Sequence, residues 1–277
     1  MRGRKPLSSI SPVIYRISVF LRRRLRSLRW HLGREKFTTC LSGGTLPETV
    51  AAHRSILMRK LEGTDETLQR NKITSLRTAA SLIDGVIINP GEVFSFWRLV
   101  GKPVRRRGFL PGLQLSFGEL VSMVGGGLCQ FSNLLHWMVL QTPLEVTERH
   151  RHSFDPFPDY RRTVPFGTGA TVFYNYLDLM FVNNTPWRFQ IKTWVDEHNL
   201  QGEIRCGKKL PRRISIEERN HRFVRTGGTV YRENELWRIE TDTQTSEVVS
   251  EELIMKNHAE VRYDVTEIPG ISVIESD

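Results

Sequence analysis

The sequence predicts an α+β fold, in which one core domain mixes helices with antiparallel strands, between a basic N-terminal helix and a β-rich C-terminal extension. Apolar residues recur at helical spacing over residues 13–32 and again from Ile73 to Ile83. From about residue 172 onward, short apolar runs indicate strands separated by turn residues such as Asn183–Pro186 and Gly227–Gly228. No internal repeat or low-complexity tract interrupts this pattern, so the chain is expected to form ordinary globular domains.

Three parts are expected along the chain: a basic amphipathic arm at residues 1–36, a core domain at residues 66–206 and a β-rich extension at residues 207–277. A chain of 277 residues with 39% hydrophobic and 25% charged residues has the composition of a folded protein. Its three cysteines are scattered and form no Cys-x-x-Cys pair, which excludes a disulfide framework and a cysteine-rich zinc module. This cysteine usage favours a reducing compartment, and we expect a cytoplasmic protein.

The whole net charge of +10 lies in the N-terminal arm. Residues 1–36 contain eleven lysines and arginines against one acidic residue, Glu35, so the rest of the chain is neutral. A nucleic-acid-binding domain carries its positive charge on the fold itself, which argues against a nucleic-acid partner. No segment reaches the ~18 uncharged apolar residues that a membrane-spanning helix needs. Pro12 and the serines before it also interrupt any signal-peptide core.

The arm has the residue pattern of an amphipathic helix. Its apolar positions recur every three or four residues, and its arginines lie mostly off that face. The apolar positions are Ile14, Ile17, Leu21, Leu25, Leu28 and Leu32. Such a helix can rest on an anionic membrane surface through residues 13–32, which would place the protein at the inner membrane face. Packing of the same stripe on the protein's own body, or nucleic-acid binding, are the alternatives.

The elements of the core follow from local signals. We expect a loop around a short helix at Leu46–Leu61, then a helix that ends at Gly85. Val86–Ile88 and Val93–Trp97 should form a hairpin closed by the turn Asn89–Gly91. Residues 98–124 are mixed, and a helix should follow at Leu128–Gln141. The expected later strands are Phe173–Val182, Phe189–Val195 and Gly202–Cys206, with Gly227–Gly228 as a hairpin turn in the extension.

The segment Gly125–Gln130, with the sequence Gly-Gly-Gly-Leu-Cys-Gln, carries the candidate site. Consecutive glycines permit a positive φ or a backbone packed too closely for a Cβ, and both allow close approach to a ligand. Cys129 falls in the first turn of the following helix, where free N–H groups favour the thiolate. The residues expected to shape a ligand pocket are Gly125, Gly126, Gly127, Gln130, Ser132 and Asn133.

Histidines that could serve Cys129 as a base lie downstream, at His150 and His152. Asp155 or Asp159 could orient such an imidazole. Three interpretations remain open: a catalytic pair of Cys129 with His152 or His150, a ligand pocket without catalysis, or a purely structural segment. A metal held by Cys129, His150 and His152 would lack the usual spacing of ligands on one element, so no metal or other cofactor is expected.

Four motifs resemble the VanW family, which is linked to vancomycin B-type resistance. They are Pro90–Phe96, Gly125–Gln130, Glu148–Ser153 and Asn183–Thr185. The resemblance covers about residues 66–206 and implies a bacterial protein with a role at the cell envelope. It transfers no catalytic residue. Where the family usually has Asp-Ala-Thr-Val, this chain begins the same motif with Gly169. If that aspartate completes a catalytic set in the family, this chain lacks it, which argues against an enzyme.

Two functions of different classes are therefore expected. The first is an accessory protein of cell-envelope metabolism or glycopeptide resistance, whose pocket at Gly125–Gln130 takes a cell-wall precursor. The second is a Cys–His-dependent enzyme that acts on amide or acyl bonds of cell-wall precursors.

Overall fold

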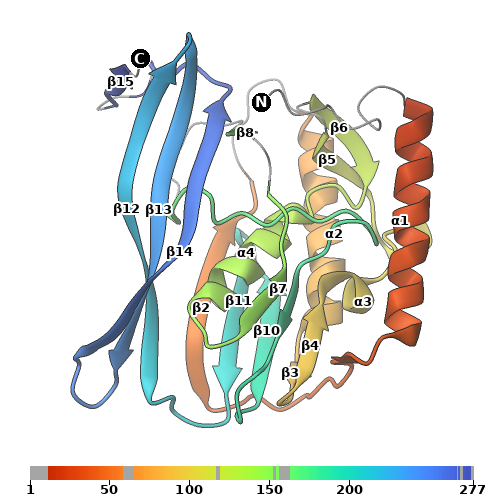
Figure 1. Ribbon diagram of the computed structural model, residues 1–277. Coiled ribbons are helices and arrows are strands. Elements are labelled where there is room, and N and C mark those ends of the chain that lie inside the picture. Colours follow the sequence, from red (N-terminus) through yellow and green to blue (C-terminus); the bar gives the residue numbers. More distant parts are fainter. Residues whose placement is uncertain are drawn as a thin grey trace.

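The structure is a computed structural model that describes residues 12–58, 65–116, 119–151, 154–155, 163–266, 268 and 271–275. These residues form an α+β fold with four α-helices and largely antiparallel sheets, as the sequence predicts. Figure 1 shows the N-terminal helix on one side of the central part and the long C-terminal strands on the other.

An antiparallel sheet with the strand order β2-β11-β10-β3 is the base of the core. Its strands are β2 (Glu48–Ile56), β3 (Val86–Ile88), β10 (Phe189–Val195) and β11 (Asn199–Cys206). Helices α2 (Glu66–Ile83) and α4 (Cys129–Leu140) cover one face of this sheet. Thr193 donates a hydrogen bond to the Ala80 carbonyl in α2, and the paired Gly202 lies against Leu134 and Met138 of α4. The sheet is therefore buried on the face that carries α4.

A second sheet has the order β1-β4-β9-β7 and lies beside the first. Its strands are β1 (Lys36–Phe37), β4 (Glu92–Ser95), β7 (Glu145–Glu148) and β9 (Met180–Val182). The rings of Phe94 and Phe181 stack with their centroids 4.3 Å apart. The short helix α3 (Phe96–Val100), the 3-10 turn Arg105–Arg107 and the hairpin of β5 (Pro111–Ser116) with β6 (Glu119–Val124) connect this sheet to α4.

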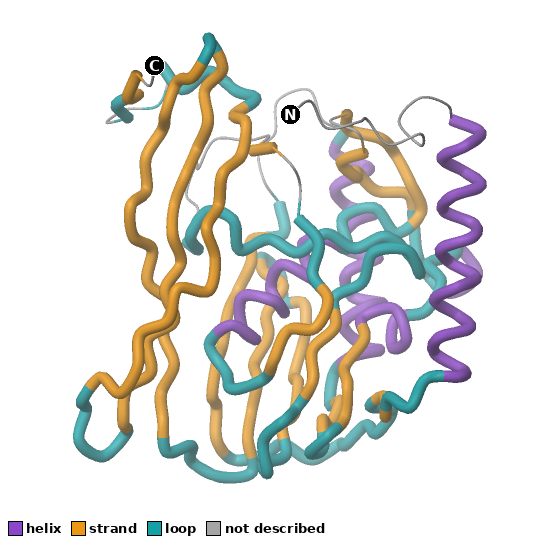
Figure 2. The backbone as a smooth tube through the Cα atoms, viewed as in Figure 1, coloured by secondary structure: helices purple, strands orange, loops and turns teal. Residues whose placement is uncertain are grey.

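The C-terminal extension forms a sheet in the order β15-β12-β13-β14-β8, in which the three central strands are long and the two edge strands are short. The strands are β8 (Phe154–Asp155), β12 (Arg212–Thr226), β13 (Thr229–Asp242), β14 (Val248–Val261) and β15 (Val273–Glu275), and Figure 2 shows how far they extend. Gly227 and Gly228 both have positive φ, at 55° and 81°, and close the β12–β13 hairpin as expected. The short strand β8 comes from the core segment, so this sheet holds part of the core at its edge.

Helix α1 (Pro12–Leu32) confirms the helix expected in the N-terminal arm. It stands at the side of the molecule near α3 and the β5–β6 hairpin (Figure 1). None of the helices in the described ranges combines the length and the apolar composition needed to span a membrane.

Three local predictions are wrong. The short helix expected at Leu46–Leu61 is strand β2, because pairing with the distant β11 decides the conformation of a segment with weak local preference. The turn at Asn89–Gly91 exists, but β3 pairs with β10 while β4 pairs with β9, so the two strands form no hairpin. The strand expected over Phe173–Val182 is shortened to β9, because a turn at Phe173–Leu177 precedes it.

Candidate functional site

The three glycines form the turn that leads from β6 into α4. Gly125 and Gly127 have positive φ, at 80° and 92°. A Cβ on Gly126 would overlap the carbonyl group of Gly112 in β5, and one on Gly127 would overlap the Lys72 side chain. The sequence-based expectation of positive φ or close backbone packing is confirmed at each of the three positions.

Cys129 is the first residue of α4 and points toward the segment around Val172. Its thiol donates to the Val172 carbonyl over 3.7 Å. Burial raises the pKa of the Cys129 thiol, against hydrogen bonds that lower it. The expected activation by the helix N-terminus is thus outweighed by desolvation in this structure.

A cleft of about 870 Å³ opens beside Cys129. Its walls come from β2, α4, the loop at residues 163–171 and β14, so it lies between the core and the C-terminal sheet. Of the expected pocket residues, Gly127, Gln130 and Asn133 line the cleft together with Cys129. A smaller cavity of about 240 Å³ also borders Cys129, with Gly125 in its wall.

Gly126 and Ser132, the pocket candidates that line neither cavity, hold neighbouring segments in place. Gly126 packs on Gly112, and the buried Ser132 hydroxyl donates to the Ala170 carbonyl at 2.6 Å. Asn133 accepts from the Ala170 N–H at 2.6 Å, so two residues of α4 hold the same short segment. That segment begins at Gly169, where a Cβ would meet only Asn133, at 3.4 Å. The position that would carry the family's aspartate therefore lies in the cleft wall.

Charge in the cleft is predominantly positive. Arg54, Lys72 and Arg151 line it, and Asp155 is the acidic residue among the described lining residues. The Asp155 carboxylate already accepts from Arg232 at 3.1 Å and from the Tyr263 hydroxyl at 2.9 Å. Arg54 and Lys72 lie far from the glycine–cysteine motif in the sequence, and no local signal marked them as site residues.

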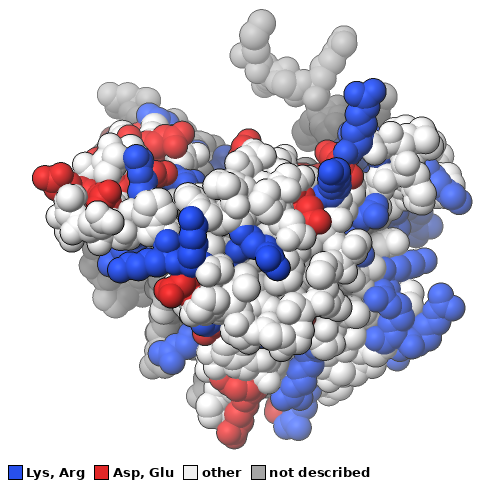
Figure 3. Space-filling view, turned by 90° about the horizontal axis from the view of Figure 1, so that it is seen from below, with Lys and Arg blue, Asp and Glu red and all other residues white. Residues whose placement is uncertain are grey.

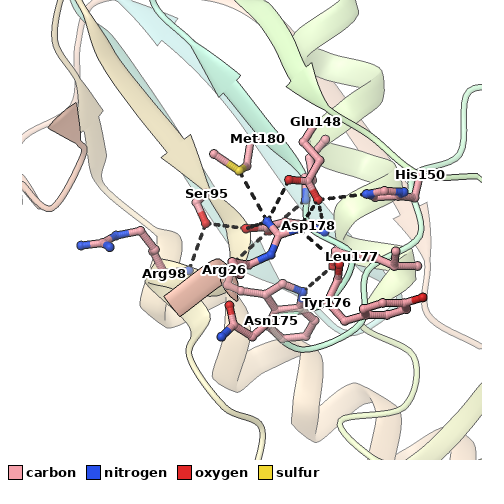
Figure 4. A network of polar contacts seen from close by, with 12 residues as sticks. Arg26, Ser95, Arg98, Glu148, His150, Asn175, Tyr176, Leu177, Asp178 and Met180 are labelled. Atoms are coloured by element: carbon pink, nitrogen blue, oxygen red, sulfur yellow. Dashed lines mark hydrogen bonds and ion pairs between the residues drawn. The ribbon is translucent and has the colours of Figure 1, made fainter. Parts of the chain in front are cut away.

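His150 takes part in a different group of contacts, around two carboxylates (Figure 4). Its Nε2 lies 2.9 Å from Glu148, which also binds Arg26 of α1 at 2.6 Å. Beside them, Asp178 accepts from the Ser95 hydroxyl at 2.6 Å and lies 3.8 Å from Arg26. The side-chain hydrogen-bond partner of His150 is therefore Glu148 and not Cys129.

The pKa values of the two carboxylates in this group shift in opposite directions. Burial works to raise the pKa of Glu148, but hydrogen bonds from His150, Arg26 and the Asp178 N–H lower it to about 2. Burial raises the pKa of Asp178 to about 6, although the Ser95 hydroxyl and the Arg26 charge work in the other direction. Glu148 therefore keeps its charge on the Arg26 ion pair even in mild acid, whereas Asp178 takes up a proton near pH 6.

The other expected catalytic residues are placed as follows. His152 and Asp159 lie outside the described residues. Asp155 accepts hydrogen bonds from Arg232 and from the Tyr263 hydroxyl. The backbone N–H of Thr171 donates to the His150 carbonyl at 2.8 Å, so the backbone at His150 lies next to the segment that Cys129 contacts. Among the described residues, no three His, Cys, Asp or Glu side chains gather as metal ligands do.

Comparison with known proteins identifies relatives that match the core of this fold. The family model described as VanW like protein matches residues 71–205. The vancomycin B-type resistance protein VanW of Enterococcus faecalis (strain ATCC 700802 / V583) is 32% identical over 223 residues, which is 80% of this chain and 81% of that protein. The uncharacterized protein YoaR of Bacillus subtilis (strain 168) is 32% identical over 161 residues, 53% of this chain and half of its own length. No solved structure shows a significant match. With about a third of residues identical over four fifths of both chains, the chain belongs to the VanW family.

Proposed function

We propose that this protein is a ligand-binding accessory protein of bacterial cell-envelope metabolism, and that the cleft beside Cys129 binds an anionic cell-wall precursor. The observation that carries the proposal is the positive lining of the cleft. The relative in Enterococcus faecalis is named for vancomycin B-type resistance, which connects that protein with the cell wall.

The volume and chemistry of the cleft support a ligand of this class. About 870 Å³ lies within the range of clefts that bind small molecules, roughly 300–1,000 Å³. Arginine binds carboxylates and phosphates through paired N–H donors, and Arg54 and Arg151 both reach this space. The side-chain amide of Asn133 adds a hydrogen-bonding group from α4. A precursor that carries phosphate and peptide groups would use both kinds of partner.

Calorimetric titration with a nucleotide-linked muramyl pentapeptide tests the proposal. Arg54→Gln and Arg151→Gln should each weaken binding about tenfold, since a hydrogen bond to a charged group contributes roughly 1.5–3 kcal/mol. Arg77→Gln is the matched control, because Arg77 is exposed on α2 and outside the cleft lining. Binding that is absent, or equally strong in both cleft variants, would contradict the proposal.

The second candidate is an enzyme in which Cys129 attacks an amide or acyl bond of such a precursor. Cys129 lines the cleft, which is the observation in its favour. Its raised pKa is unfavourable for a nucleophile, because the thiolate is the reactive form. Mass spectrometry of the precursor after incubation distinguishes the two functions. A change in precursor mass that Cys129→Ser abolishes would establish the enzyme.

A further inference from the structure

Helix α1 carries its leucine stripe on the outside of the molecule. The side chains of the stripe are exposed to between 42% (Ile14) and 74% (Leu32). Phe20 and Val13 beside the stripe are also exposed, at 55% and 64%. Six neighbouring aliphatic side chains in water are unusual on a folded surface, where apolar residues normally occur singly. The described part of the chain therefore does not cover the stripe.

Arginines, rather than leucines, attach α1 to the body. Arg26 forms its ion pair with Glu148, and its side chain is only 17% exposed. Arg23 donates to the Tyr174 carbonyl at 2.9 Å, and Ser27 accepts from Asn175 at 2.9 Å. On the same side, the guanidinium of Arg98 lies 5.3 Å from the centre of the Trp30 ring. These contacts fix the rotation of the helix so that the apolar stripe faces away from the core.

Further arginines of α1 remain on the solvent side, around the stripe. Arg24 and Arg29 are exposed. At 100° per residue, Arg24 lies on one flank of the stripe and Arg29 on the other. Figure 3 shows lysines and arginines gathered along the side of the molecule where α1 stands. An apolar strip with cations on both flanks is complementary to a bilayer surface that has acyl chains below anionic phosphates.

We propose that the outward stripe of α1 docks this protein on an anionic lipid bilayer, with the helix axis in the plane of the membrane. The leucines enter the boundary between headgroups and acyl chains, and Arg24 and Arg29 contact lipid phosphates. A nucleic acid would leave the exposed leucines in water, so the charge pattern alone does not favour it. This surface is separate from the cleft beside Cys129, so the docking does not depend on the ligand proposed there.

Flotation of the full chain with vesicles tests the docking. We expect binding to phosphatidylcholine vesicles that contain phosphatidylglycerol, with much weaker binding to phosphatidylcholine alone, and a decrease at high salt. The variant with Leu21→Gln and Leu25→Gln should bind at least about tenfold more weakly, since each lost leucine removes roughly 1.5–3 kcal/mol of apolar burial. Arg24→Gln with Arg29→Gln should remove the preference for the anionic lipid.

The matched control is Val248→Gln with Val249→Gln, because these valines are exposed on β14 at 56% and 45%. This variant should bind vesicles as the wild type does. All variants change exposed side chains, so circular dichroism should show an unchanged fold. The proposal is overturned if the wild type ignores anionic vesicles or if the leucine variant binds them equally well. It is also overturned if sedimentation shows a dimer that the leucine variant dissociates, because a second copy then covers the stripe.

Discussion

At the scale of single residues, Cys129 shows two opposing effects on one thiol. The N-terminus of α4 offers N–H groups that favour a thiolate, whereas burial beside Val172 favours the neutral thiol. The net effect is a raised pKa, so the cysteine is held in its less reactive form. A ligand-binding role is compatible with such a thiol, and a catalytic role needs a base that restores the thiolate.

Alkylation rates provide a direct measurement of this state. We expect iodoacetamide to modify Cys129 more slowly than the exposed Cys40 near neutral pH, because the Cys129 side chain is half-buried and its pKa is raised. Peptide mass spectrometry over a time course and across pH resolves the two sites. Faster modification of Cys129 at pH 7 would instead support the enzyme.

The residues of the candidate site were predictable only where they are close in sequence. The three glycines predict the turn. The helical pattern places Cys129, Gln130 and Asn133 at the start of α4, and these residues line the cleft. Arg54 joins them because β2 pairs with β11, more than 140 residues later in the chain. Such pairing depends on the complete fold, and a local pattern cannot reveal it.

At the scale of elements, the turn before α4 is fixed by backbone contact between the end of β6 and the start of β5. Gly126 lies directly against Gly112, which holds the β5–β6 hairpin next to the helix. The amphipathic period of α1 predicted the helix itself but not its orientation. Periodicity identifies an apolar face, whereas the carboxylates that bind Arg26 decide which face points inward.

Substitution at this turn should destabilise the protein. Gly126→Val would place a branched side chain into the carbonyl of Gly112 and force the two backbones apart. We expect a loss of about 1–3 kcal/mol in the free energy of unfolding, the usual cost of a strained site. Urea denaturation followed by circular dichroism measures it. Gly43→Val is the control, because its added Cβ has no neighbour within 4 Å, and equal stability of both variants would refute the argument.

At the scale of the whole molecule, the loop at residues 163–171 joins the core to the C-terminal sheet. Asn234 and Asn257 both donate to the carbonyl of Phe166. From the core side, His136 of α4 binds the Thr168 carbonyl through Nδ1 at 2.7 Å. The loop also forms one wall of the cleft, so its attachment on both sides defines the shape of the candidate site. The sequence predicted a core domain followed by a β-rich extension, but these contacts between distant residues were not visible in it.

The attachment through His136 should make stability depend on pH. Burial, with a contribution from the Arg149 charge, lowers the pKa of His136 to about 3, so the folded protein keeps the imidazole neutral. An unfolded histidine has a pKa of about 6.5, and between these values the unfolded state binds the additional proton. The free energy of unfolding should therefore fall as pH decreases from about 6.5 to 3, by roughly 1.4 kcal/mol for each pH unit.

His136→Gln should be less stable at pH 7 but should lose less stability on acidification than the wild type. The control His198→Gln removes an exposed imidazole, 77% accessible, and should keep the wild-type slope. Urea unfolding at a series of pH values checks the slopes, and an undiminished acid loss in His136→Gln would show that this histidine does not carry the dependence.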